Sequence, residues 1–181
     1  MIAVTSLLDP EHTVLVNDLI DALQQKFGLS TVKMTPYPHV TWFTAEVGDL
    51  SHLKELLYSF AERSQPFQIH TSGLGIFPGP APVIYIPVLR TSPVNQYHSR
   101  LFRKTKTICE EMGSYYDPDS WIPHITLAVG DTTPEILGGV LEFLNQFTFD
   151  WEINIDNLAI LSKTGDKYLK EEVFMLNTAL A

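Results

Sequence analysis

The chain has 181 residues, of which 45% are hydrophobic and 18% charged, so it can bury a sizeable core and is neither disordered nor fibrous. Its formal net charge of −9 repels a long polyanion, which makes long RNA an unfavourable partner and predicts that any phosphate ligand is small. The single cysteine, Cys109, excludes an internal disulfide, and without a signal peptide or an apolar run of roughly 20 residues we expect a soluble, cytoplasmic protein with no membrane partner.

The first half of the chain predicts the order strand, helix, strand, helix, strand. Residues 2–8 form a strand, and residues 10–27 form a helix with one apolar face between a cap at Asp9 and a stop at Gly28. The pattern then predicts a strand over 39–47, a helix over 53–62 and a strand over 67–77. The proline-rich segment 77–82 marks the junction with the second half.

The second half predicts the same order of elements. Strands are expected over 83–89, 124–129 and 151–161, and helices over 93–112 and 134–145. A turn at 163–166 allows a final strand over 166–177. We therefore expect a single domain with one lobe at about residues 1–78 and the other at about 79–181.

One tetrapeptide pattern occurs in both halves, as Pro38-His39-Val40-Thr41 and Pro123-His124-Ile125-Thr126, with the histidines 85 residues apart. Other landmarks recur at nearly the same interval. The cap-and-proline pairs at 9–10 and 92–93, the cap candidates Ser51 and Thr133, and the segments 67–77 and 151–161 are 82 to 84 residues apart. This repeated order indicates a diverged internal duplication.

Strand geometry gives the tetrapeptides a physical meaning, because side chains at i and i+2 project from the same face. His39 and Thr41 therefore share one face of their strand, as His124 and Thr126 do of theirs. The residues between and after them point into the core. If a pseudo-twofold axis relates the two strands, the two His-Thr pairs approach one another across a cleft.

Two imidazoles and two hydroxyls match the needs of phosphodiester hydrolysis. The reaction needs a base for the attacking water and an acid for the leaving oxygen, and imidazoles can serve as both near neutral pH. Hydroxyl groups can donate hydrogen bonds to the non-bridging phosphate oxygens. The sequence predicts no metal and no cofactor, since it has no His-x-His, no His-x₃-His and no second cysteine.

In these two motifs the chain resembles the two-histidine (2H) phosphoesterases, which include 2′-5′ RNA ligase-like proteins and cyclic nucleotide phosphodiesterases. The hairpin-like segment 73–87 adds to the resemblance. It implies a bilobal α+β fold with pseudo-twofold duplication, in which mainly antiparallel sheets flanked by helices enclose a central cleft. It also implies metal-independent hydrolysis of 2′,3′-cyclic phosphates to 2′-phosphates, with His39 and His124 as the acid-base pair and Thr41 and Thr126 as phosphate-binding residues.

One departure from that family concerns the segment after the second motif. Many members carry a basic residue there, whereas this chain has Leu127-Ala-Val-Gly-Asp131. The departure disfavours RNA binding and ligation. Two alternatives stay open: an enzyme that processes or ligates 2′-5′ oligonucleotides or RNA ends, and a non-catalytic nucleotide-binding module. The oligomeric state is not predicted by any pattern in the chain.

Aromatic side chains near the motif strands could stack on a nucleobase, and core packing is the competing interpretation for each of them. Phe43 in particular is expected on the face of His39 from its i+4 spacing. The candidates are Tyr37, Phe43, Tyr85, Tyr115, Tyr116 and Trp121.

A cluster of basic residues between positions 90 and 106 is the one local exception to the acidic balance. It indicates either a solvated helix face or a basic rim that attracts an anion to a nearby cleft. The cluster consists of Arg90, Arg100, Arg103, Lys104 and Lys106.

Overall fold

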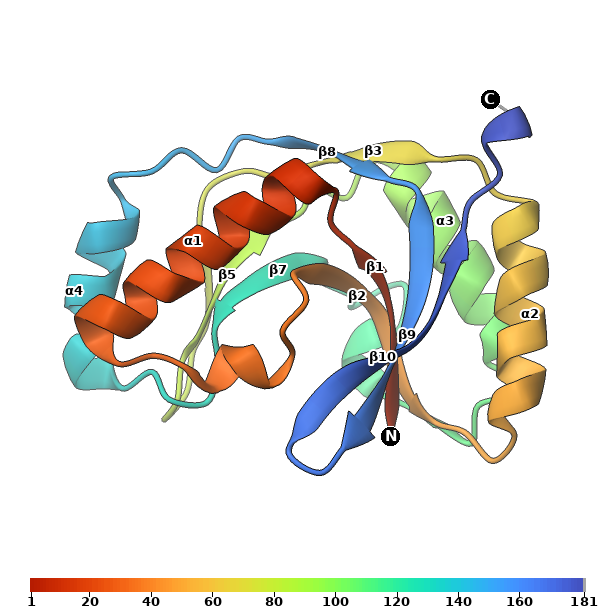
Figure 1. The fold of residues 1–181 in the computed structure, drawn as a ribbon, viewed down its shortest axis with the longest axis horizontal. Helices are drawn as coiled ribbons and strands as arrows, with labels where there is room; N and C mark the ends of the chain where they lie inside the picture. Colours follow the sequence, from red (N-terminus) through yellow and green to blue (C-terminus); the bar gives the residue numbers. More distant parts are fainter. Residues whose placement is uncertain (181) are drawn as a thin grey trace.

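Helices α1 and α4 lie on one side of a set of β-strands and helices α2 and α3 on the other (Figure 1), in a computed structural model that describes residues 1–180. None of the helices in this range is both long and apolar enough to cross a membrane. The elements in chain order are β1 (Ile2–Leu7), α1 (Pro10–Phe27), η1 (Thr31–Met34), β2 (His39–Glu46), α2 (Leu50–Glu62), β3 (Phe67–His70), β4 (Gly75–Phe77), β5 (Val83–Pro87), α3 (Ser92–Thr105), β6 (Glu111–Met112), η2 (Ser114–Tyr116), β7 (His124–Ala128), α4 (Pro134–Leu144), β8 (Glu152–Ile155), β9 (Asn157–Thr164), β10 (Lys167–Met175) and η3 (Thr178–Leu180).

The strands form three antiparallel sheets whose topology shows the predicted pseudo-twofold relation. The five-stranded sheet has the order β10-β9-β1-β2-β6, the three-stranded sheet β4-β5-β7, and β3 pairs with β8. The trio β9-β1-β2 corresponds to the trio β4-β5-β7, and in each trio one strand comes from the other half of the chain. Strands β6 and β10 of the second half complete the five-stranded sheet. The sheets therefore do not divide the chain at residue 78, because strands from both halves are interleaved.

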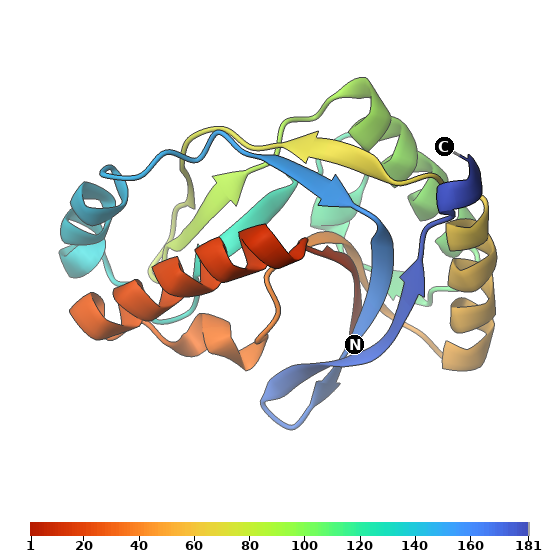
Figure 2. The ribbon, with the colours of Figure 1, turned by 45° about the horizontal axis from the view of Figure 1, so that its top comes forward.

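The expected strands over 67–77 and 151–161 are each two strands. Their first parts, β3 and β8, pair with one another, and Figure 2 shows them side by side. Their second parts, β4 and β9, pair with β5 and β1. In the first of these segments Gly73 has a φ of 67°, a left-handed conformation that costs glycine little and lets the chain change direction.

The expected helix over 93–112 ends at Thr105. The backbone N–H groups of Ile108 and Cys109 both donate to the carbonyl of Thr105, which closes the last turn. Residues 111 and 112 then pair with Glu46 and Ala45 as β6 at the edge of the five-stranded sheet. Pairing with an open sheet edge thus overrides the helical pattern of this segment.

Both motif strands carry a β-bulge immediately after the motif threonine. Val4 pairs with Phe43 whereas Thr5 pairs with Thr41, and the same shift recurs between Ile84 and Tyr85 against β7. In each strand two consecutive residues are consequently fully buried, Trp42 with Phe43 and Leu127 with Ala128. The expectation that Phe43 shares the face of His39 is therefore wrong, because the bulge reverses the alternation and turns Phe43 into the core.

Helix α1 has the predicted bounds. Asp9 is its N-cap, Pro10 is its first residue, and Gly28 ends it with a φ of 76°. The Asp9 carboxylate accepts hydrogen bonds from the backbone N–H of His12 at 2.9 Å and of Asn154 at 3.2 Å. The cap thereby joins α1 to β8 as well as closing its own first turn.

Replacing Asp9 with alanine is expected to lower the free energy of unfolding by about 1–2 kcal/mol at pH 7, because the cap hydrogen bonds are lost. Burial raises the pKa of Asp9, but the hydrogen bonds from His12 and Asn154 outweigh it, so the pKa lies below 3.8. The stabilisation is present above that value and is lost as the pH falls through the folded-state pKa. Urea titrations at pH 7 and pH 3 measure it, with Asp49→Ala, which removes a cap bonded only to His52, as the control. An equal loss of unfolding free energy at pH 7 and pH 3 would contradict the assignment of ionised Asp9 as the stabilising cap.

Candidate active site

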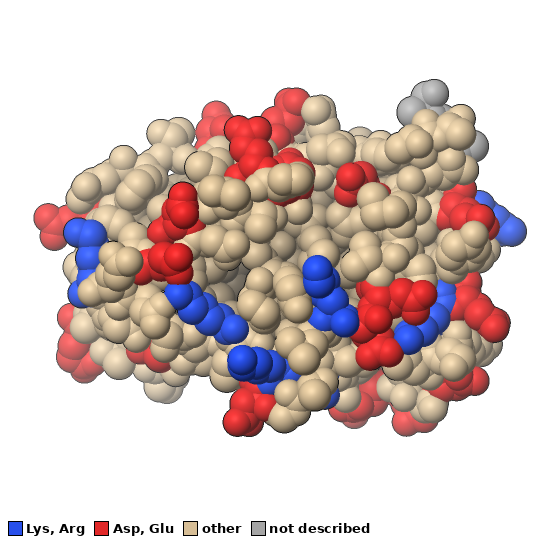
Figure 3. Space-filling view, viewed as in Figure 1, with Lys and Arg blue, Asp and Glu red and all other residues tan. Residues whose placement is uncertain are grey.

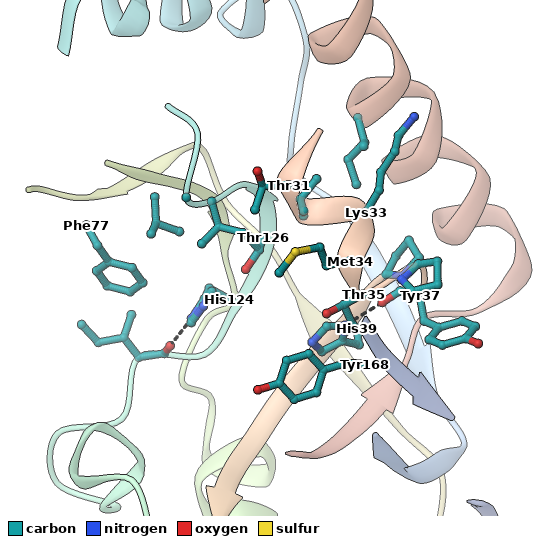
Figure 4. Close-up of a pocket in the computed structure, with 18 of the residues that line it drawn as sticks. Thr31, Lys33, Met34, Thr35, Tyr37, His39, Phe77, His124, Thr126 and Tyr168 are labelled. Atoms are coloured by element: carbon teal, nitrogen blue, oxygen red, sulfur yellow. Dashed lines mark hydrogen bonds between the residues drawn. The ribbon is translucent and has the colours of Figure 1, made fainter. Parts of the chain in front are cut away.

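A cavity of about 790 Å³ lies between the two motif strands and η1. Its volume is in the range of small-molecule sites in proteins. It receives side chains from both halves of the chain, from α1 and from β10, and its lining includes His39, His124 and Thr126. The structure thus brings both predicted histidines to the wall of one cavity, as Figure 4 shows.

The two histidine rings are held in the same way. Nδ1 of His39 lies 2.6 Å from the carbonyl oxygen of Tyr37, and Nδ1 of His124 lies 2.7 Å from that of Ile122. A carbonyl can only accept, so Nδ1 carries the hydrogen in both rings and Nε2 keeps its lone pair when the ring is neutral. The same tautomer is therefore imposed on both histidines.

The proline before each histidine anchors this arrangement. Leu8 N–H donates to the carbonyl of Pro38 at 3.1 Å, and Val88 N–H donates to that of Pro123 at 3.0 Å. Each bond ties the entry of a motif strand to the end of the neighbouring strand. Both prolines are buried, so the residue directly before each histidine is packed against the core.

The surroundings of the two rings favour their neutral forms. Burial lowers the pKa of His39 below 6.5; the Tyr37 carbonyl opposes this, and a positive charge on His124 lowers it further. Burial also lowers the pKa of His124, against the effect of the Ile122 carbonyl. Protonating one ring thus disfavours protonation of the other, so the pair suits a state with one neutral and one charged imidazole.

Aromatic rings pack around His124. Its ring centroid lies 5.1 Å from that of Phe77 and 5.1 Å from that of Tyr85, and these two rings stack at 4.2 Å. Gly75 makes this possible, because a Cβ there would lie only 2.2 Å from the Tyr85 ring. The hairpin segment therefore places aromatic rings against the second histidine.

The six candidate aromatic residues have different positions. Tyr37, Tyr115 and Tyr116 line the cavity, and Tyr115 is 83% exposed at its mouth. Phe43 is completely buried in the core, which rules out the predicted stacking on a ligand.

The remaining two aromatic candidates are also nearly buried, so the structure does not support them as stacking surfaces. Tyr85 is 8% exposed and lies against Phe77 and His124. Trp121 is at the cavity wall but only 1% exposed, and its ring stacks on His98. Both rings are occupied by contacts within the protein.

The two motif threonines differ in position. Thr126 lines the cavity together with both histidines. Thr41 is half-buried on the same face of β2 as His39 but lies outside the set of described residues that line the cavity. The two histidines thus occupy equivalent positions at the cavity, as the predicted symmetry requires, whereas the two threonines do not.

Sequence reasoning missed η1, which forms one wall of the cavity with Thr31, Val32, Lys33 and Met34. The side chain of Asp131 anchors its start by accepting from the N–H groups of Ser30 at 2.6 Å and Thr31 at 2.8 Å. The acidic end of the segment after the second motif therefore has a structural role. The duplication offered a signal, since η1 and η2 begin 83 residues apart, at Thr31 and Ser114.

Positive charge is scarce at the cavity. Lys33 is the only Lys or Arg among the described residues that line it, and its Nζ bonds to Asp21 at 2.6 Å. Figure 3 shows Lys and Arg side chains on this face interspersed with acidic groups rather than gathered into a broad basic surface. The described residues 1–180 contain no group of three or more His, Cys, Asp and Glu side chains placed to hold a metal ion.

The basic cluster between positions 90 and 106 does not contribute to the cavity lining. Arg90 donates to the carbonyls of Trp121 at 3.2 Å and Pro118 at 2.7 Å. Arg100 and Arg103 border a separate depression on α3. The structure therefore favours the solvated-face interpretation over the basic rim.

Solved structures establish the fold class. The chain matches TT0787 of Thermus thermophilus with a TM-score of 0.67 and 18% identity over 97% of each chain. It matches a phosphoesterase with a TM-score of 0.58 and 14% identity, and Escherichia coli LigT in complex with 3′-AMP with a TM-score of 0.57 and 15% identity, again over 97% of each chain. At these identities the likeness concerns the fold.

The family follows from the sequence match. A profile described as the 2′-5′ RNA ligase superfamily matches residues 11–167, which include both tetrapeptides. The chain therefore belongs to this superfamily of 2H phosphoesterases and ligases, as its motifs predicted. No curated protein matches the chain.

Proposed function

We propose that this chain is a metal-independent phosphodiesterase that opens a small 2′,3′-cyclic phosphodiester to a 2′-phosphate. The matched anchoring of the two histidines supports the proposal most directly. Each ring donates from Nδ1 to the carbonyl two residues before it, and both rings lie at one cavity. Two similarly oriented imidazoles are what acid-base catalysis by a histidine pair requires.

In the proposed reaction the neutral imidazole accepts a proton at Nε2 from a water molecule as the water oxygen attacks phosphorus. The bond from phosphorus to the 3′ oxygen breaks, and the charged imidazole gives its Nε2 proton to that oxygen. The hydroxyl of Thr126, with Thr41 as its counterpart, donates to the non-bridging oxygens. The product carries the phosphate on the 2′ oxygen, and the two imidazoles have exchanged protonation states.

The walls of the cavity suit a small ligand with an aromatic group. The rings of Tyr37, Tyr115, Tyr116 and Tyr168 lie among its lining, and stacking on such rings tolerates any nucleobase. A net charge of −9 disfavours long RNA. LigT, which shares the fold, was crystallised with 3′-AMP, ATP and NADP+, so nucleotides are the first compounds to test.

The test is turnover of a panel of nucleoside 2′,3′-cyclic monophosphates in EDTA, followed by phosphorus NMR, with His124→Ala in parallel. We expect a 2′-phosphate that forms with the wild type and not with the variant. If the folded wild type turns over none of the panel, the proposal fails. That result would favour the alternatives: an enzyme that acts on 2′-5′ oligonucleotides or RNA ends, or a non-catalytic nucleotide-binding module.

The pH profile of kcat/KM is expected to be bell-shaped, with its maximum on the acid side of pH 6.5. Burial lowers the pKa of both histidines, so in the free enzyme the fraction with one charged ring is largest below the ordinary value. On the acid limb the base becomes protonated, and on the alkaline limb the acid loses its proton. Steady-state kinetics from pH 4.5 to 8.5 measures the profile, and an optimum above pH 7 would contradict the protonation scheme.

Thr126→Val is expected to lower kcat/KM by about 10²-fold, because it removes a hydroxyl at the cavity wall without changing the shape of the side chain. Thr41→Val should have a smaller effect, since Thr41 lies outside the described lining. Kinetics of both variants beside the wild type measures the difference. Wild-type values for Thr126→Val would remove this residue from phosphate binding.

A further inference from the structure

Two ring N–H groups from the second half of the chain hold the bulge in the first motif strand. Nε1 of Trp121 donates to the carbonyl of Thr41 at 3.1 Å, and Nε2 of His98 lies 3.0 Å from the carbonyl of Trp42. A carbonyl only accepts, so the second contact also comes from a ring N–H. Trp42 has no register partner in β1, since the pairing passes from Thr41 to Phe43, although its ring Nε1 donates to the Ser6 hydroxyl at 2.8 Å. The two rings thus bond to consecutive carbonyls at the irregular point of the strand.

These two rings are themselves tightly held. They stack with centroids 3.8 Å apart and an interplanar angle of 14°, and each side chain belongs to a residue that is 1% exposed. Arg90 donates to the backbone carbonyl of Trp121 at 3.2 Å, and Trp121 N–H donates to the carbonyl of Asp117 at 2.8 Å. Burial also lowers the pKa of His98 to about 4, which keeps its ring neutral at ordinary pH.

Trp121 is connected to the second motif through the chain. It directly precedes Ile122, whose carbonyl accepts from Nδ1 of His124. Its ring bonds to Thr41, which lies two residues after His39. One side chain therefore links the backbone that orients the second histidine to the strand that carries the first.

We propose that Trp121 and His98 are positioning residues that fix the position of the first motif strand relative to the second. They thereby fix the position of His39 relative to His124. They touch no reacting atom and act through the carbonyls of Thr41 and Trp42. The proposal rests on the proposed function for its kinetic consequences. Its structural content can be tested without any substrate.

A displaced motif strand should reduce the rate of the chemical step more than it reduces binding. Misplacement of a catalytic group by about 1 Å can cost about 10²-fold in rate. Trp121→Phe keeps an aromatic ring at this position but removes the N–H together with the five-membered ring of the indole, and His98→Leu removes the second donor. We expect kcat to fall by about 10-fold or more in each variant, with KM within about threefold of the wild type.

His98→Gln supplies the rescue test, because its side-chain amide can present an N–H to the same carbonyl. It should recover most of the kcat that His98→Leu loses. Tyr97→Phe is the matched control. Tyr97 precedes His98 on α3, and the centroid of its ring lies 4.9 Å from that of Trp42. Its hydroxyl is buried and has no hydrogen-bond partner among the described residues. Removing that hydroxyl should leave kcat unchanged.

The closing experiment combines these kinetics with NMR titration of the His39 and His124 rings in every variant, after circular dichroism has confirmed folding. A shifted His39 titration in Trp121→Phe and His98→Leu, with recovery in His98→Gln, is the expected result. Wild-type titrations and wild-type kcat in folded Trp121→Phe and His98→Leu would overturn the proposal. If the wild type itself hydrolyses no cyclic phosphodiester, the proposed function fails, while the titrations alone still decide the positioning role.

Discussion

His124→Ala is expected to lower kcat by about 10³-fold with the fold intact, and His39→Ala should do the same. Loss of a general acid or base typically costs 10²–10⁴-fold. Both rings lie at the cavity wall and neither supports the core through a long-range hydrogen bond, because each Nδ1 bonds to a carbonyl only two residues away. Removal of either imidazole should therefore affect the reaction far more than the stability.

The control for these variants is His52→Ala, which removes an exposed histidine from α2. Its kcat should match that of the wild type. The double variant of His39 and His124 should be little slower than either single variant, because residues that act as a unit are not additive. Substantial turnover by either single alanine variant would reject the acid-base assignment, whatever the effect on KM.

Acidification from pH 7 to pH 4 is expected to lower the free energy of unfolding by up to roughly 3 kcal/mol through His98 alone. Burial lowers the pKa of His98 from 6.5 to about 4. The positive charge of Arg90 also lowers this pKa, whereas the hydrogen bond to the Trp42 carbonyl raises it. Between these values the unfolded chain binds a proton that the folded chain does not. Stability therefore falls as the pH falls through this window.

Urea titrations at several pH values between 7 and 4 measure this dependence, with His98→Gln as the comparison. The glutamine variant should be less stable at pH 7 but should show a flatter dependence on pH, since it has no group to protonate at this position. The histidines of the cavity are present in both proteins and cancel in the difference. Parallel pH dependences for the two proteins would show that His98 is not buried in its neutral form.

The local pattern of this chain predicted most of its elements. Helix α1 has the expected bounds because a capping aspartate, a first-turn proline and a terminal glycine mark it in the sequence. Strands β2 and β7 begin at the expected histidines. Val40 and Ile125 are fully buried, as the alternation at the start of each strand requires. The interval between landmarks also anticipated the pseudo-twofold arrangement of strands.

The errors concern features that depend on distant parts of the chain. The bulges after Thr41 and Thr126 arise from pairing with β1 and β5, so alternation continued past them placed Phe43 on the wrong face. The expected helix over 93–112 stops at Thr105, and residues 111–112 pair with the edge of β2. Neither partner is adjacent in sequence.

The candidate site shows the same division. The repeated tetrapeptide predicted two histidines that approach one another, and the structure places both at one cavity. It could not indicate that Trp121 would be buried against His98, nor that Asp131 would hold η1 over the cavity. These contacts join residues 23 and about 100 positions apart.

By itself, then, the sequence determined most of the elements, the duplication and the two histidine motifs, because caps, alternation and repeats act over a few residues or recur at a constant interval. Only the tertiary structure decided how strands are exchanged between the halves, where the motif strands bulge and which rings face the cavity. These depend on which backbone donors and acceptors meet across the fold and on which apolar surfaces exclude water together. The pairing of backbone groups and the burial of apolar surfaces both arise only when segments distant in the sequence pack together.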